Sequence, residues 1–97
     1  MSELIQQSPQ HDVLVDARGL ACPIPLLKAR LEIKRMEAGQ VLLVMSTDAG
    51  TQRDFRTFAG SSSHEVLQEE SGEGEFRFWL RVGTPEARRP EPREYLL

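Results

Sequence analysis

The hydrophobic pattern of residues 13–45 changes its period twice, and this limits the chain to few folds. Residues 13–15 (VLV) precede an aspartate and a glycine turn, which is typical of a short strand. From Pro25 the apolar residues recur at spacings of three and four, which predicts a helix that ends at Gly39. Residues 41–45 are apolar at every position, which favours a strand buried on both faces. Together they predict a right-handed parallel crossover.

The first helix is predicted to bury one face and to carry charge on the rest of its surface. Its predicted core positions are Leu26, Ala29, Ile33 and Met36. Its charged positions are Lys28, Arg30, Glu32, Lys34, Arg35 and Glu37.

The second half of the chain predicts another helix and a hairpin. Thr51, followed three residues later by Asp54, is typical of a capping pair at the start of a helix over residues 51–60. Residues 64–70 are predicted as a strand, the SGEG stretch after them suits a hairpin turn, and residues 76–82 alternate apolar and polar side chains. The predicted fold is an α+β two-layer sandwich in the order βαβαββ, with both helices on one face of a four-stranded mixed sheet. In this pattern Trp79 faces outward, either as an exposed interface residue or packed under a tail.

Length and composition indicate one domain between two tails. The 97 residues are 39% hydrophobic and 28% charged, values that suit a compact fold. We expect the domain to cover residues 12–83, with flexible tails at 1–11 and 84–97, where the final Tyr95-Leu96-Leu97 is either a frayed end or a docking handle. No apolar run is long enough to span a bilayer and the first residues lack a signal pattern, so we expect a cytoplasmic protein without membrane contact.

Charge and cysteine count exclude several classes of function. A net charge of −3 argues against direct binding of nucleic acid. One cysteine and two separated histidines leave no internal disulfide and no zinc spacing. We therefore expect no metal and no bound cofactor, and we expect a monomer.

The single cysteine lies in DARGLACPIP, residues 16–25, where the first helix is predicted to begin. A residue before proline avoids the helical conformation, so Cys22 is expected just outside the helix, with Pro23 and Pro25 in its first turn. Free backbone amides at this start would surround the sulfur with partial positive charge. They belong to Ile24, Leu26 and Leu27. The pKa of the Cys22 thiol is therefore predicted to lie below the usual value of about 8.5, with help from Arg18 if that side chain turns toward the sulfur. A Cys22 that is merely a small buried hydrophobic residue is the alternative, and position alone leaves it open.

Two further residues of this stretch are expected to support the site. Gly19 lets the loop backbone approach closely because it has no β-carbon. Asp16 ends the first strand, where its carboxylate is expected to brace loop amides rather than act as a general base.

These residues resemble a known family of sulfur carriers. Asp16-x-Arg18-Gly19-x-x-Cys22-Pro23-x-Pro25, followed by a basic amphipathic helix, looks like the TusA/SirA family over about residues 12–83. The resemblance implies a βαβαββ domain, similar to the C-terminal domain of bacterial translation initiation factor three, in which Cys22 carries sulfane sulfur as a persulfide. Ile24 departs from the acid that the tRNA-thiolation members carry between the prolines, so the resemblance leaves open tRNA thiolation, sulfur oxidation, and selenium or molybdenum-cofactor metabolism.

A carrier of this kind needs two protein partners. The resemblance implies a donor such as a cysteine desulfurase or a rhodanese, and an acceptor with its own cysteine. Partner docking is expected on the rim of the site. The candidates are Arg30, Lys34, Asp48 and Arg53. Because the chain has no second cysteine, no thiol of its own can attack the persulfide, form a disulfide and release the sulfur. The single cysteine also argues against a dithiol oxidoreductase.

Two other classes of function are kept beside the carrier. A regulatory or interaction module would retain the fold with an inert Cys22. A small nucleic-acid-binding domain is suggested by fold similarity alone, and the acidic balance counts against it.

Overall fold

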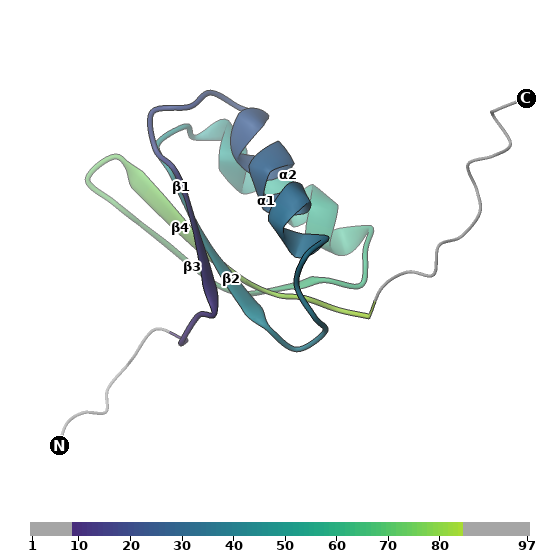
Figure 1. Cartoon of the computed structure of the whole chain (residues 1–97). Coiled ribbons are helices and arrows are strands. Elements are labelled where there is room, and N and C mark those ends of the chain that lie inside the picture. The colour runs from purple at the N-terminus through teal and green to yellow at the C-terminus, as the bar shows by residue number, and fades with distance from the viewer. Residues whose placement is uncertain (1–8, 85–97) are drawn as a thin grey trace, which may run out of the picture.

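The computed structural model describes residues 9–84, which form six elements in the predicted order βαβαββ (Figure 1). The strands are β1 (Val13–Ala17), β2 (Val41–Ser46), β3 (Glu65–Gly72) and β4 (Glu75–Arg81), and the helices are α1 (Ile24–Ile33) and α2 (Gly50–Gly60). The predicted tails lie almost wholly outside the described residues, as does Tyr95-Leu96-Leu97, so the domain boundaries stay a prediction.

The four strands form one mixed sheet in the order β1-β2-β4-β3. β1 pairs in parallel with β2, whereas β4 runs antiparallel to both of its neighbours. The β3–β4 hairpin turns at Glu73 and Gly74, both at positive φ, as the SGEG stretch predicts. Both helices cover one face of the sheet, which confirms the two-layer α+β sandwich (Figure 1). Because β1 and β2 are parallel, their carboxyl ends meet at one edge of the sheet.

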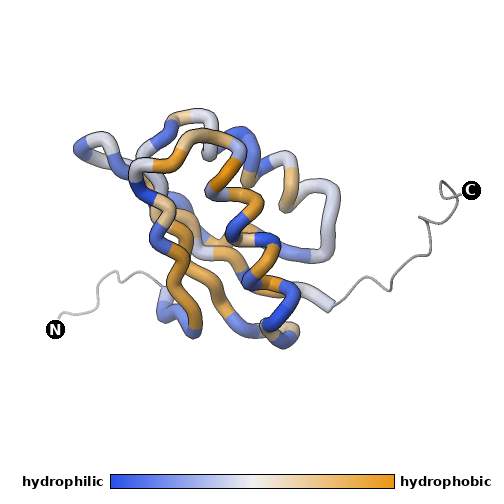
Figure 2. The backbone as a smooth tube through the Cα atoms, turned by 45° about the horizontal axis from the view of Figure 1, so that its top comes forward, coloured by the Kyte–Doolittle hydropathy of each residue, from blue (hydrophilic) through white to orange (hydrophobic). Residues whose placement is uncertain are grey.

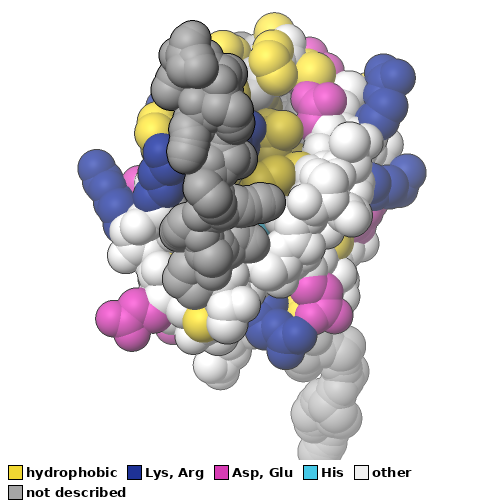
Figure 3. All heavy atoms as spheres, turned by 90° about the vertical axis from the view of Figure 1, so that its right-hand side faces the viewer, with side chains coloured by type: hydrophobic (Ala, Val, Ile, Leu, Met, Phe, Trp, Pro, Cys, Tyr) yellow, Lys and Arg dark blue, Asp and Glu magenta, His cyan; other side chains and the backbone are white. Residues whose placement is uncertain are grey.

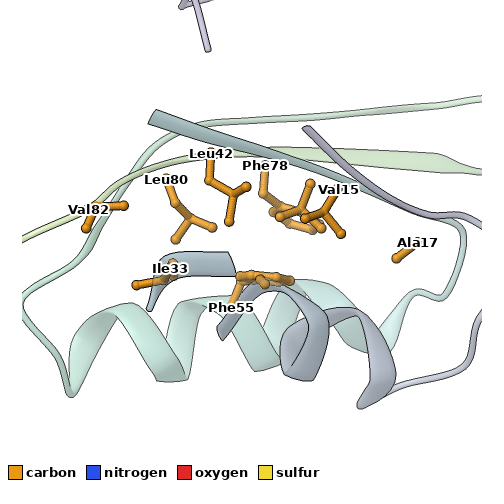
Figure 4. Close-up of a cluster of buried hydrophobic side chains, with 10 residues drawn as sticks. Val15, Ala17, Ile33, Leu42, Phe55, Phe78, Leu80 and Val82 are labelled. Atoms are coloured by element: carbon orange, nitrogen blue, oxygen red, sulfur yellow. The ribbon is translucent and has the colours of Figure 1, made fainter. Parts of the chain in front are cut away.

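The core lies between the sheet and the helices (Figure 4). Alternate residues of each strand point inward, and Phe55 of α2 stacks on Phe78 of β4 with 4.9 Å between ring centroids. The buried cluster consists of Val15, Ala17, Ala29, Ile33, Leu42, Val44, Phe55, Phe78, Leu80 and Val82.

β2 is central in the sheet and buried on both faces, as its continuous apolar run predicts. Leu42 and Val44 belong to the core, whereas Leu43 lies on the opposite face beside Trp79, its partner in register on β4. Trp79 is only 3% exposed, so the prediction of an exposed interface residue is wrong. Its indole N–H has no hydrogen-bond partner within residues 9–84.

The first helix is shorter than predicted. α1 ends at Ile33 rather than at Gly39. After Ile33 the amides of Arg35 and Met36 donate to carbonyls three residues back, at 2.8 and 3.0 Å, so the backbone forms tighter turns in place of the α-helical pattern. Gly39 lies in the loop that follows, with φ +95°. Of the predicted core positions, Ala29 and Ile33 are buried, and Leu26 and Met36 are partly buried.

The capping pair predicted for the second helix is wrong. α2 begins at Gly50, and Thr51 lies inside it, with its hydroxyl 2.8 Å from the buried Ser46 hydroxyl. The N–H of Gly50 instead donates to Oδ1 of Asp48 at 2.8 Å, which satisfies an amide of the first turn. The side chain of Asp54 therefore has a different role.

Phe55→Ala is expected to lower the free energy of unfolding by about 3–5 kcal/mol, because it removes a fully buried ring and leaves a cavity against Phe78. Urea denaturation followed by circular dichroism measures the loss. Leu67→Ala, which truncates an exposed side chain on β3, is the control and is expected to change stability by about 0.5 kcal/mol or less. Equal losses in the two variants would contradict this account of the core.

Candidate functional site

The site lies where the carboxyl ends of β1 and β2 meet. The loop after β1 is tied to the end of β2 by two hydrogen bonds: the N–H of Gly19 donates to Oγ1 of Thr47 at 2.8 Å, and the N–H of Cys22 donates to Oδ2 of Asp48 at 3.1 Å. Gly19 has φ +84°, a conformation that glycine adopts without strain. The predicted parallel crossover thus brings residues 26 to 28 positions apart into contact.

Cys22 lies just outside the first helix, as predicted, and the structure shows that it is exposed. The alternative of a buried, merely hydrophobic cysteine is therefore wrong. Pro23 forms the N-cap of α1 rather than part of its first turn, and the Cys22–Pro23 peptide bond is cis. Pro25 is in the first turn, as predicted, and its ring is fully buried against the core.

The sulfur of Cys22 rests against the second helix. Sγ donates a hydrogen bond to Oδ2 of Asp54 at 2.6 Å. A β-carbon on Gly50 would come within 3.3 Å of Sγ and 3.2 Å of Oδ1 of Asp48, so the start of α2 packs closely on the thiol. The carboxylate of Asp48 links the two elements, because one oxygen accepts the N–H of Cys22 and the other accepts that of Gly50.

The electrostatics around Cys22 are opposite to the prediction. The hydrogen bond to Asp54 raises the pKa of the Cys22 thiol, and partial loss of solvent and the negative charges of Asp54 and Asp48 raise it further. Arg53 is the group that lowers this pKa, and it is outweighed. Cys22 is therefore a protonated thiol at neutral pH, and the predicted thiolate is wrong.

Two of the three amides expected to stabilise a thiolate, those of Ile24 and Leu27, are used within the chain. The N–H of Ile24 donates to the carbonyl of Ala21 at 2.8 Å, and that of Leu27 donates to the carbonyl of Pro23 at 3.1 Å. These bonds form because a cap and a loop turn precede the helix, and they leave the N-terminus of α1 with less positive charge to offer the sulfur.

Arg18 is held away from Cys22 by two acids. Its guanidinium binds both carboxylate oxygens of Asp16, at 2.8 and 2.9 Å, and Glu75 at 3.0 Å. The hydrogen bonds from Arg18 lower the pKa of Asp16 to about 2. The predicted turn of Arg18 toward the sulfur is wrong. Asp16 also accepts the N–H of Arg18 at 3.2 Å, which is the contact expected of a brace for the loop.

The predicted docking residues differ in position and in exposure. Arg30, Lys34 and Arg53 are exposed, and the guanidinium of Arg30 lies over the ring of Phe58 at 5.7 Å. Asp48 is half-buried and occupied by the two loop amides. A docking role for these four residues stays a prediction.

Sequence reasoning missed two residues of the site, Asp54 and Gly50. The sequence predicts Asp54 as half of a capping pair and indicates no role for Gly50. The signal that points to them is the parallel crossover, because it places the segments that follow both strands side by side.

Two general features of the described residues bear on the site. No helix within residues 9–84 has the length and apolar character needed to cross a membrane. The same residues contain no group of three or more His, Cys, Asp or Glu side chains suited to hold a metal ion.

Comparison with known proteins places this geometry in context. The sequence model of the family described as "Sulfurtransferase TusA" matches residues 13–82. The chain is 37% identical over 75 residues to the putative sulfur carrier protein YrkI of Bacillus subtilis, covering 76% of this chain and 99% of YrkI. It is 39% identical over 70 residues to the sulfur carrier protein TusA of Allochromatium vinosum, covering 72% of this chain and 92% of that protein.

The fold also matches a solved structure. The crystal structure of a SirA-like protein from Desulfitobacterium hafniense superposes with a TM-score of 0.66, covering 74% of this chain and 99% of that one at 23% identity. This likeness confirms the fold class.

Asp54→Asn is expected to move the pH dependence of Cys22 alkylation to lower pH. The carboxylate raises the pKa of the thiol, so removing its charge lowers that pKa, and the reactive thiolate forms at lower pH. The rate of reaction with iodoacetamide across neutral and alkaline pH, followed by intact mass, measures the shift. Glu32→Gln, the same change of charge on a residue of α1 that pairs with Arg35, should leave the profile in place. A profile that does not move in Asp54→Asn would rule out the proposed effect of the carboxylate.

Proposed function

This chain belongs to the TusA family of sulfurtransferases, and we propose that it acts as a sulfur carrier, accepting sulfane sulfur on Cys22 as a persulfide and passing it to an acceptor protein. The observation that carries the proposal is the exposed thiol of Cys22 at the mouth of α1. The sequence contains no other cysteine, so the transferred sulfur atom can be bound as a persulfide only on Cys22.

Both half-reactions are exchanges between sulfur atoms that need no external oxidant or reductant. In the first, Cys22 loses its proton and attacks the outer sulfur of the donor persulfide. The new S–S bond forms on Cys22, the donor S–S bond breaks, and the donor cysteine leaves and regains a proton as a thiol. In the second, an acceptor thiolate attacks the outer sulfur, and Cys22 leaves and returns to the thiol.

Asp54 shapes the resting state of this carrier. Because its carboxylate accepts the S–H hydrogen bond, Cys22 waits as a thiol, which is a poor nucleophile and resists oxidation. The thiolate must form during the encounter with a donor. A cationic group of the donor near Asp54 would counter the carboxylate and lower the pKa of the thiol at that moment.

The partners in this proposal are proteins. A cysteine desulfurase or a rhodanese is the donor, and a protein with its own cysteine is the acceptor, with no direct contact to nucleic acid. The carrier works in the cytoplasm as a monomer and holds no cofactor besides the covalent sulfur. The pathway served by the acceptor stays open, because Ile24 differs from the acid of the tRNA-thiolation members.

The raised pKa of Cys22 favours a second candidate function. A regulatory or interaction module could use the Cys-Pro-x-Pro turn as a rigid loop and leave the thiol inert, in which case the Asp54 contact is only structural. The two functions differ in whether Cys22 takes up sulfur.

Incubation with a cysteine desulfurase and cysteine, or with a rhodanese and thiosulfate, is expected to add about 32 Da to the protein, one sulfur atom transferred by exchange. Intact mass spectrometry measures the gain. The added mass should disappear with a reductant and should be absent in Cys22→Ser. No gain from either donor would argue for the regulatory module and against the carrier.

A further inference from the structure

α1 exposes an apolar stripe on the side that faces away from the core. Ile24, Leu27 and Leu31 are spaced by three and four residues, so they share one face of the helix. They are 39%, 47% and 63% exposed, whereas Pro25, Ala29 and Ile33 on the opposite face are buried. Figure 2 shows hydrophobic residues along much of α1, consistent with a helix that is apolar on two faces. The sequence predicts charge on this outer surface, and the three exposed apolar side chains correct that prediction.

The stripe begins beside Cys22. Ile24 follows Cys22 by two residues, and both are exposed at the same end of the helix. From Ile24 to Leu31 the axis of the helix extends about 10 Å. A protein that brings its own sulfur onto Cys22 can therefore rest on the stripe at the same time.

Basic side chains flank the stripe on both sides. At about 100° per residue, Arg30 and Lys34 fall on the side toward α2, where Arg30 lies over Phe58. Lys28 and Arg35 fall on the side toward β1, where both line a shallow hollow with Leu14 and Leu31. Asp16 and Glu32 also line this hollow, and Arg35 pairs with Glu32 at 3.6 Å, so the cations without an acidic neighbour there are fewer than on the α2 side. Figure 3 shows hydrophobic side chains at the surface of this side of the molecule, with both basic and acidic side chains near them.

We propose that this apolar stripe and the basic side chains beside it form the docking face for the sulfur-donating protein, which would present an apolar patch next to its persulfide and acidic side chains farther along, where it meets Arg30 and Lys34. The inference rests on the proposed function and names the chemistry of the partner. Two observations support the proposal. The stripe is continuous with Cys22, so a donor bound on it can place its own sulfur next to that of Cys22. The basic side chains favour a partner whose facing surface is acidic. An anionic lipid surface is disfavoured, because Asp48 and Asp54 place negative charge at the sulfur end of the face.

The test compares two reactions for each variant: the transfer of sulfur from a donor protein to Cys22, and the alkylation of Cys22 by a small reagent. In the double variant Leu27→Gln/Leu31→Gln, the carrier concentration for half-maximal loading by the cysteine desulfurase or rhodanese is expected to rise about tenfold or more, since two apolar contacts are lost. The alkylation rate of Cys22 by iodoacetamide should stay unchanged. Leu67→Gln, at an exposed leucine on β3, is the matched control and should behave as wild type in both assays.

The basic side chains beside the stripe have their own variant. Lys34→Glu is expected to weaken loading from the protein donor and to reduce its sensitivity to salt, because one attractive charge becomes repulsive. Equal loading of wild type, the double variant and Lys34→Glu would overturn the proposal, as would equal losses in loading and alkylation, which would mean that the thiol itself was disturbed.

Other occupants of the face give distinct results that would also overturn it. A wild-type dimer in sedimentation that the double variant dissociates would assign the face to a second copy. Faster loading after truncation at Thr84 would assign it to the chain's own C-terminal segment. Binding to anionic phosphatidylserine vesicles that the double variant loses would assign it to a membrane. If wild type takes up no sulfur from either donor, the proposed function fails and this inference falls with it.

Discussion

The carboxylate of Asp48 holds the site together. One of its oxygens accepts the N–H of Cys22 and the other accepts the N–H of Gly50, so a single side chain joins the loop before α1 to the start of α2. An anionic acceptor makes a stronger hydrogen bond to an amide than a neutral one does. The position of the thiol relative to α2 depends on this link, because the loop from residue 18 to 23 has no strand partner of its own.

This link explains why the sulfur has an acidic environment. Because the loop is held next to α2, the thiol lies within hydrogen-bond distance of Asp54 in the second turn of that helix. It is therefore close to the negative charges of both Asp54 and Asp48. The nearby cations do not cancel this negative charge. Arg18 is bound by Asp16 and Glu75, and Arg53 offsets only part of the effect of the two acids on the pKa of Cys22. A protonated thiol is chemically quiet until a partner changes the local charge, which suits a carrier that should exchange sulfur only with its own partners.

α1 serves two purposes with its two apolar faces. Its inner face, with Pro25, Ala29 and Ile33, closes the core against the sheet. Its outer face leaves three large apolar side chains partly exposed beside one another, and a contiguous apolar patch often marks a binding surface. The rigid helix thus positions a thiol at its start and an apolar surface along its length.

The sequence by itself determined the order of the elements, the mixed sheet, the central place of β2 and the position of Cys22 just before α1. These follow from local rules: the period of apolar residues, turn chemistry at glycine, and the restriction that proline places on its neighbour. Only the tertiary structure decided that Cys22 is exposed, that Asp54 of α2 binds its thiol, and that Arg18 turns toward Glu75 rather than toward Cys22. The two contacts join residues 32 and 57 positions apart, so they depend on where the side chains lie after packing. The pKa of Cys22 depends on the sum of such contacts, so its direction could not be obtained from the spacing of the motif.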